Sequence, residues 1–228
     1  MTFEQLQKTI GFRFKDQKFL KLAFVHRSYL NENREFTSSN ERIEFLGDAV
    51  LSFLTSHFLY RTYPHYPEGI LTNIRSSLVK TTSLAQIAQT LEFGKLLFLS
   101  KGEEEGGGRN NISLLADTFE AFLGALFLDS GIDVAKKFLE TFLFPKAAAI
   151  VTNKSYVDFK SLLQEIVQEK SRISPTYLVK KTEGPDHAKT FWVEAVVGNS
   201  VIGAGMGKSK QEAEQQAAMA ALEKTGKI

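Results

Sequence analysis

Apolar residues recur at helical spacing through the first two thirds of the chain. Between residues 3 and 146 the clearest runs are residues 43–59, 70–91 and 114–128, where apolar side chains return every three or four positions. Turn-forming residues interrupt these runs, for example in the glycine-rich segment 102–108. No stretch of this part alternates as a β-strand does. The pattern predicts an all-helical domain.

The pattern changes after Pro145 to shorter segments. An amphipathic helix comes first, with apolar residues from Phe159 to Val167 at helical spacing. A last helix is expected over residues 209–224, and Ser209 with Glu212 would form a capping box at its start. Between these helices lie three strand-like runs, at residues 176–181, 190–197 and 200–205.

The expected fold class is therefore mainly α, with a smaller α+β domain. We expect the all-helical domain over residues 1–150 and an α-β-β-β-α domain over residues 155–226. Residues 146–154 are mostly small, with polar residues among them, and this composition predicts a tether between the domains, with residues 151–154 as the linker.

Composition narrows the chemistry. The chain has no cysteine, which excludes disulfides, thiolate metal sites and cysteine nucleophiles. Its net charge is +2, and residues 154–228 hold 11 Lys and Arg against 9 Asp and Glu, so affinity for nucleic acid must come from local placement of charge. No secretory signal and no membrane-spanning stretch is visible, so we expect a cytoplasmic protein with no membrane partner.

Acidic residues mark one face of the helix over residues 43–59 and its first turn. At 100° per residue, Glu41, Glu44 and Asp48 project within an arc of roughly 60°. Phe45 and Leu51 flank these acids closely. The opposite side is expected to carry the apolar residues Ile43, Leu46, Val50, Phe53 and Leu54.

A second helix repeats the arrangement with Asp117 and Glu120, three positions apart. Gly124 falls on the same face one turn later and leaves room for a close neighbour. No Lys or Arg occurs between Ile112 and Asp129, so these acids have no local cationic partner.

Carboxylates in such apolar surroundings are costly unless a cation accompanies them. Oxygen ligands without thiolate or neighbouring histidine suit Mg²⁺ or Mn²⁺ better than Zn²⁺. Two helices of this kind could hold two ions about 4 Å apart, a geometry that assists phosphodiester hydrolysis. The alternative is a solvated acidic stripe, or ion pairs with Arg42, Arg75 or Lys80. The residues alone leave both interpretations open.

Three motifs follow one another along the chain: His26-Arg-Ser-Tyr29, Asn40-Glu-Arg-Ile-Glu-Phe-Leu-Gly-Asp-Ala-Val-Leu51, and Gly107-Gly-Arg-Asn110 leading to Ala116-Asp-Thr-Phe-Glu-Ala121. In type and order they resemble the motifs of the ribonuclease III family. The longest motif has Ile43 where that family usually has Leu. The resemblance covers essentially the whole chain.

The resemblance implies a homodimeric endonuclease that cuts double-stranded RNA with Mg²⁺, or Mn²⁺ in its place. It would leave 5′-phosphate and 3′-hydroxyl ends with short 3′ overhangs, acting on ribosomal and messenger RNA precursors. Phe45 would enter a socket on the partner subunit, although simple core packing is an alternative. Glu41 and Glu68 would be auxiliary acids. The metal acids would be Glu44, Asp48, Asp117 and Glu120, with Asp48 and Glu120 catalytic.

The C-terminal domain resembles a double-stranded-RNA-binding domain. Such domains contact roughly 16 base pairs, largely by shape. Lysines at the start of the last helix would meet phosphate where free N–H groups and the helix dipole add to the attraction. The residues expected to contact RNA are Lys160, Gln164, Pro185, Asp186, His187, Lys208, Ser209 and Lys210.

Gly203-Ala-Gly-Met-Gly-Lys-Ser209 resembles a phosphate-binding loop, but that loop needs glycine where Ile202 stands, so no nucleotide cofactor is expected. Two competing functions are weighed: a non-catalytic regulator that binds double-stranded RNA, and a metal hydrolase that acts on some other phosphodiester. Replacement of a metal acid would favour the regulator, and all four acids are present. The RNA-binding domain disfavours the other hydrolase.

Overall fold

The computed structural model describes residues 1–185 and 188–226. The chain forms two compact units, Met1–Tyr156 and Val157–Ile228, each with its own core. The expected residues Asp186 and His187 lie outside the described part of the chain. Within that part, no helix is both long and apolar enough to cross a membrane.

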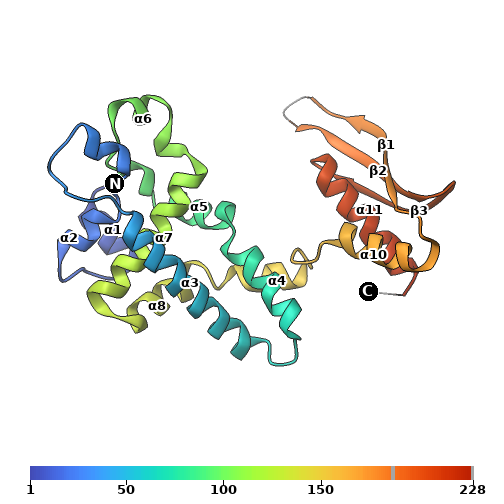
Figure 1. Ribbon diagram of the computed structural model, residues 1–228, viewed down its shortest axis with the longest axis horizontal. Coiled ribbons are helices and arrows are strands. Elements are labelled where there is room, and N and C mark those ends of the chain that lie inside the picture. Colours follow the sequence, from blue (N-terminus) through green and yellow to red (C-terminus); the bar gives the residue numbers. More distant parts are fainter. Residues whose placement is uncertain (186–187, 227–228) are drawn as a thin grey trace. The chain divides into compact units, whose positions relative to one another are not determined.

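Unit 1 is helical, as the spacing of apolar residues predicts (Figure 1). The only strand-like contact among its described residues is an isolated bridge between Val25 and Phe98. Its α-helices are α1 (Phe3–Ile10), α2 (Gln17–Leu22), α3 (Glu41–Thr62), α4 (Glu68–Val79), α5 (Thr81–Thr90), α6 (Lys101–Glu105), α7 (Ile112–Ser130), α8 (Ile132–Phe142) and α9 (Lys146–Thr152). Short 3-10 turns are η1 (Arg27–Asn31), η2 (Phe93–Lys95) and η3 (Gly108–Asn110).

Helix α7 is the centre of unit 1, and it packs against α2, α3, α5 and α8. Its apolar residues are buried almost all round, which explains why so few of its positions are polar. Phe122 lies fully buried in the middle, with ring centroids 5.1 Å from Phe93 and 6.0 Å from Phe24. This aromatic cluster fixes the helix that carries Asp117 and Glu120.

Helices α3 and α7 touch through their main chains. A Cβ atom on Gly124 would lie 2.2 Å from the Ile43 carbonyl oxygen, and one on Gly47 would lie 1.8 Å from the Glu120 carbonyl oxygen. Only glycine fits at these two positions. The room predicted beside Gly124 is therefore filled by the backbone of α3.

Two expectations for unit 1 are corrected. Phe53 was expected on the apolar core side of its helix, yet 61% of its surface is exposed, because α7 covers only one side of α3. The segment expected as a tether forms helix α9 over Lys146–Thr152. A start at Pro145 and an alanine run favour a helix, and the buried Ala147 holds it on unit 1.

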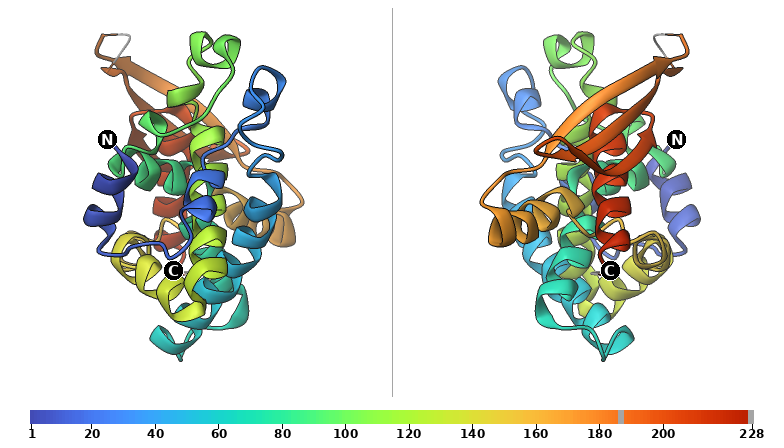
Figure 2. Two further views of the ribbon diagram at one scale, coloured as in Figure 1. Left: turned by 90° about the vertical axis from the view of Figure 1, so that its left-hand side faces the viewer. Right: turned by 90° about the vertical axis from the view of Figure 1, so that its right-hand side faces the viewer.

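Unit 2 has the expected α-β-β-β-α order. Helix α10 (Phe159–Ser171) precedes strands β1 (Thr176–Glu183), β2 (Thr190–Val197) and β3 (Ser200–Gly207), and α11 (Lys210–Lys224) follows. The sheet is antiparallel in the order β1-β2-β3, and β1 and β3 extend two residues beyond the predicted runs. Both helices lie on one face of the sheet (Figure 2).

The glycines of β3 allow this strand to pack closely against α11. A Cβ atom on Gly205 would lie 2.2 Å from the Ala217 amide nitrogen, so the strand needs glycine to approach α11. The helix begins at the expected cap, where the Ser209 hydroxyl accepts the Glu212 N–H at 3.1 Å. The Glu212 carboxylate accepts the N–H of Lys208, one residue earlier than in the expected capping box.

Candidate active site

Four carboxylates gather where α3 and α7 touch. Glu44 and Asp48 lie on α3, one helical turn apart, and Asp117 and Glu120 lie on α7. Glu44, Asp117 and Glu120 are half-buried, while Asp48 is exposed. The contact at Gly47 and Gly124 places the two pairs beside each other.

The electrostatics confirm that these groups share one environment. Burial raises the pKa of Glu120 to about 8, and the negative charges of Asp48, Glu44 and Asp117 add to the rise. Burial also raises the pKa of Glu44, again with help from Asp117, and the pKa of Asp117. Like charges that are close and poorly hydrated resist ionisation, and a bound cation relieves that resistance.

No cationic side chain in the described part of the chain forms an ion pair with the cluster. None of the four carboxylates has a Lys or Arg nitrogen within 4 Å in the described part of the chain. Arg75, one of the alternative partners, instead donates to the Ser56 hydroxyl at 2.7 Å. Ion pairing therefore does not account for these acids.

The four groups offer only carboxylate oxygens, which is the type of ligand atom that hard divalent ions such as Mg²⁺ prefer. In the side-chain positions seen, no three acidic or histidine groups of the described residues converge tightly enough to enclose an ion. Mg²⁺ retains several waters and commonly uses one or two carboxylates, so a fully enclosed cage is not required. Glu44, Asp48, Asp117 and Glu120 are the residues that would hold it.

A cavity of about 240 Å³ adjoins the cluster and contains a residue to which the sequence assigned no role. It is lined by His26 and Glu41 together with Glu44 and Asp117. The sequence signal for His26 was its place in the His26-Arg-Ser-Tyr29 motif. Glu41 stands at the rim, 3.9 Å from Arg27.

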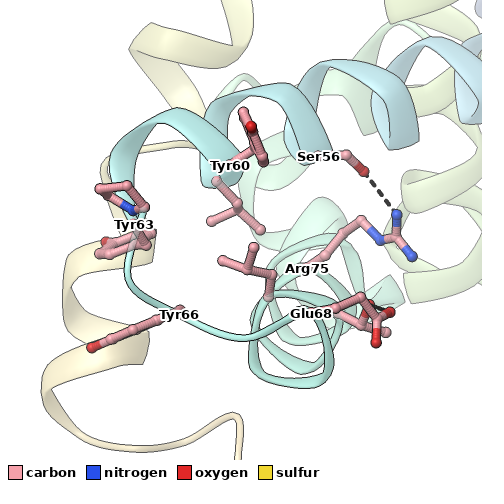
Figure 3. Close-up of a pocket in the computed structure, with 10 residues that line it drawn as sticks. Ser56, Tyr60, Tyr63, Tyr66, Glu68 and Arg75 are labelled. Atoms are coloured by element: carbon pink, nitrogen blue, oxygen red, sulfur yellow. Dashed lines mark hydrogen bonds between the residues drawn. The ribbon is translucent and has the colours of Figure 1, made fainter.

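Glu68 lies apart from this cavity. It begins α4, accepts a hydrogen bond from Thr72 at 2.9 Å, and lines a separate pocket of about 490 Å³ with Tyr60, Tyr63 and Arg75 (Figure 3). Phe45 is 81% exposed on the outer side of α3, so it takes no part in the core of unit 1. The core-packing alternative for Phe45 is wrong within this chain.

In unit 2, most of the predicted RNA contacts are exposed: Gln164 on α10, Pro185 in the loop after β1, and Lys208, Ser209 and Lys210 at the start of α11. Lys160 differs, because its ammonium forms an ion pair with Glu214 and lies 4.9 Å from the centre of the Tyr177 ring. Its ammonium is therefore already paired within unit 2 before any RNA arrives.

Comparisons with known proteins assign both units. Residues 16–147 match the Ribonuclease-III-like family, and residues 159–225 match the double-stranded RNA binding motif. The chain is 47% identical to Ribonuclease 3 of Geobacillus thermodenitrificans over 97% of its length and 90% of that protein. It is 47% identical to Ribonuclease 3 of Enterococcus faecalis over 96% of its length and 95% of that protein.

The chain belongs to the ribonuclease III family. A solved nuclease domain of ribonuclease III from Campylobacter jejuni, described for flexibility in its dimer-forming region, is also similar, with a TM-score of 0.59 and 35% identity. The match covers 63% of this chain and 99% of that domain. As a ribonuclease III, the chain is an endoribonuclease that acts on double-stranded RNA, which unit 2 binds.

Proposed function

We propose that this ribonuclease III hydrolyses phosphodiester bonds of duplex RNA with Mg²⁺, or Mn²⁺ in its place, held by Glu44, Asp48, Asp117 and Glu120. The observation that carries the proposal is the carboxylate cluster at the α3–α7 contact: three of its four members are half-buried, and none pairs with a Lys or Arg of the described residues. The endonuclease domain would span residues 1–150 and the RNA-binding domain residues 155–226. A cytoplasmic location and the lack of a nucleotide cofactor stay predictions.

The chain's own residues would act as follows. Glu44, Asp48, Asp117 and Glu120 supply negative charge at fixed positions on two touching helices, and so gather cationic charge next to the scissile phosphate. When bound, divalent ions would supply an activated water and neutralise charge on the leaving oxygen. Breakage at the 3′-oxygen leaves 3′-hydroxyl and 5′-phosphate ends, and the proposed substrates are ribosomal and messenger RNA precursors.

The exposed side of α3 supports a homodimer. Phe45 stands near one end of the helix, and the pocket with Tyr60 and Glu68 begins about 22 Å further along its axis. A two-fold axis near Phe53, which is also exposed, would bring each Phe45 to the partner's pocket. Glu68 would then stand beside the other protomer's Glu44 and Asp48, which flank Phe45, and this would give Glu68 its auxiliary role.

A substrate panel tests the function. The intact protein is incubated with long duplex RNA, the same RNA single-stranded, and duplex DNA, each with Mg²⁺ or with chelator. We expect cutting of duplex RNA alone, only with Mg²⁺, in fragments with 3′-hydroxyl ends. Cutting that survives chelation would refute the role of the carboxylate cluster.

Sedimentation of Phe45→Asp tests the dimer. A charge in an apolar socket carries a desolvation penalty, so the variant should sediment as a monomer while the wild type sediments as a dimer. Lys8→Asp, on the exposed part of α1, serves as the control for added negative charge. A variant that remains dimeric would rule out Phe45 as the dimer contact.

A further inference from the structure

Ser28 determines which ring nitrogen of neutral His26 carries the proton. The Ser28 backbone N–H points at His26 Nδ1 from 3.4 Å, and the Ser28 hydroxyl lies 2.8 Å from the same nitrogen. That hydroxyl also accepts the Ser100 N–H at 3.0 Å and keeps its own proton, which it can donate to Nδ1. A backbone N–H only donates, so Nδ1 is an acceptor and the neutral ring carries its proton on Nε2.

The backbone around His26 is fixed from two further segments. The His26 N–H donates to the Phe98 carbonyl at 3.1 Å. Buried Asn40, just before α3, donates its N–H to the Val25 carbonyl at 2.8 Å and its side-chain amide to the Ala23 carbonyl at 3.1 Å. The imidazole is therefore positioned relative to α3 before any ligand arrives.

The charged groups around the ring come from several elements. Burial lowers the pKa of His26, Arg27 adds to that effect, and Glu103 on α6, Glu41 on α3 and Asp117 on α7 oppose it. The ring lines the 240 Å³ cavity together with Asp117. Among the described residues, no group accepts a hydrogen bond from Nε2. The cavity thus contains a fixed N–H donor next to a carboxylate that it does not yet contact.

We propose that His26 is a positioning residue whose Nε2–H donates a hydrogen bond to the Asp117 carboxylate when the acidic cluster binds its divalent ion. Carboxylates that ligate metals are generally oriented by such outer partners. Hydrogen bonds of active sites are often long in the empty protein and shorten in the loaded one. Because Nε2 carries the proton, its lone pair is not available for the metal, so His26 is not itself a ligand.

The inference rests on the proposed metal function, and two substitutions separate it from a structural role. His26→Phe keeps a ring of similar size but removes the donor, whereas His26→Gln keeps an N–H near the position of Nε2. Mn²⁺ binding to the full-length protein is measured by electron paramagnetic resonance without RNA. Duplex RNA affinity is measured in chelator, and thermal unfolding is followed for each variant.

We expect His26→Phe to weaken Mn²⁺ binding about tenfold, the lower end of the effects typical of outer-shell partners, and His26→Gln to restore most of it. Duplex affinity in chelator should equal that of the wild type. Weaker duplex binding with unchanged Mn²⁺ affinity would overturn the inference in favour of an RNA contact. Equal loss in both variants, together with lowered unfolding temperatures, would overturn it in favour of a structural role. If the wild type itself bound no Mn²⁺, the proposed metal function would fail first.

Discussion

In unit 1 the proposed catalytic charges lie on helices whose main chains touch, whereas in unit 2 the proposed RNA-binding charges stand on exposed positions at the start of one helix. Glu44 and Glu120 are half-buried and mutually repelling, and glycines hold their helices together. Lys208 and Lys210 are exposed. The difference teaches that the proposed cleavage site depends on positions fixed in advance, while the proposed binding face depends on charge that water surrounds until RNA replaces it.

The largest expected effect is on cleavage alone. Glu120→Gln removes a charge from the cluster at almost constant shape, and loss of one preorganised group at such a site typically slows turnover by about 100-fold or more. Duplex affinity in chelator should not change, because unit 2 supplies it. Single-turnover cleavage and filter binding measure the two quantities. Glu140→Gln, at an exposed position of α8, is the matched control. Loss of binding together with cleavage would make Glu120 structural.

Gly124→Ala attacks the contact between helices without changing any charge. The added Cβ would meet the Ile43 carbonyl at 2.2 Å, and overpacking of this kind costs about 1–3 kcal/mol of unfolding free energy. Chemical denaturation followed by circular dichroism gives the loss, and cleavage should fall with it. Gly102→Ala, where nothing lies within 4 Å, is the control. Equal stability of the two variants would contradict the importance of the close contact.

Lys210→Ala should weaken binding and leave chemistry intact. Removal of a lysine that binds one phosphate lowers the slope of log affinity against log salt by about one. Titrations of duplex RNA at several salt concentrations measure that slope, and cleavage at saturating RNA should match the wild type. Lys224→Ala lies at the other end of the same helix and should leave the slope unchanged. If Lys210→Ala cleaved more slowly even at saturating RNA, the assignment of binding and cleavage to different units would be contradicted.

The smallest expected effect is on the stability of unit 2. Asp158 caps α10 by accepting the Ser161 N–H, and Asp158→Ala should cost about 1 kcal/mol of unfolding free energy. Trp192, the chain's one tryptophan, lies on β2 and reports this unit by fluorescence in urea. If Asp158→Ala lost no more unfolding free energy than alanine at the exposed Ser174 does, Asp158 would not act as a helix cap.

The same carboxylate predicts a pH dependence. The hydrogen bond from Gln215, and then those from Ser161, lower the pKa of Asp158 below its usual 3.8. The stabilisation is therefore complete above pH 3.8 and is lost as the pH falls through the lower folded-state pKa. Asp158→Asn keeps a cap without the charge, so its deficit should disappear in that acidic range. A deficit independent of pH would show that the charge does not matter.

The sequence predicted the helices and strands because these depend on local periodicity, and it predicted the two acidic helix faces that the structure brings together. The assignment of those acids to a metal rests on the resemblance and stays a prediction. Exposure of Phe53 was missed because an apolar residue looks the same in the sequence whether it lies in a core or on the surface. The pairing of Lys160 with Glu214 joins two helices far apart in the chain, which spacing along one helix does not reveal. The Ser28 hydroxyl beside His26 likewise accepts a hydrogen bond from Ser100, 72 residues further along the chain.

The main-chain contact at Gly47 and Gly124 also bears on how the enzyme responds to heat. Two backbones in direct contact have no side chain between them whose rearrangement could change their spacing, and such close packing transmits strain. The spacing of the carboxylate pairs should thus persist until unit 1 melts as a whole. Activity should then follow the folded fraction up to the melting temperature instead of fading well before it.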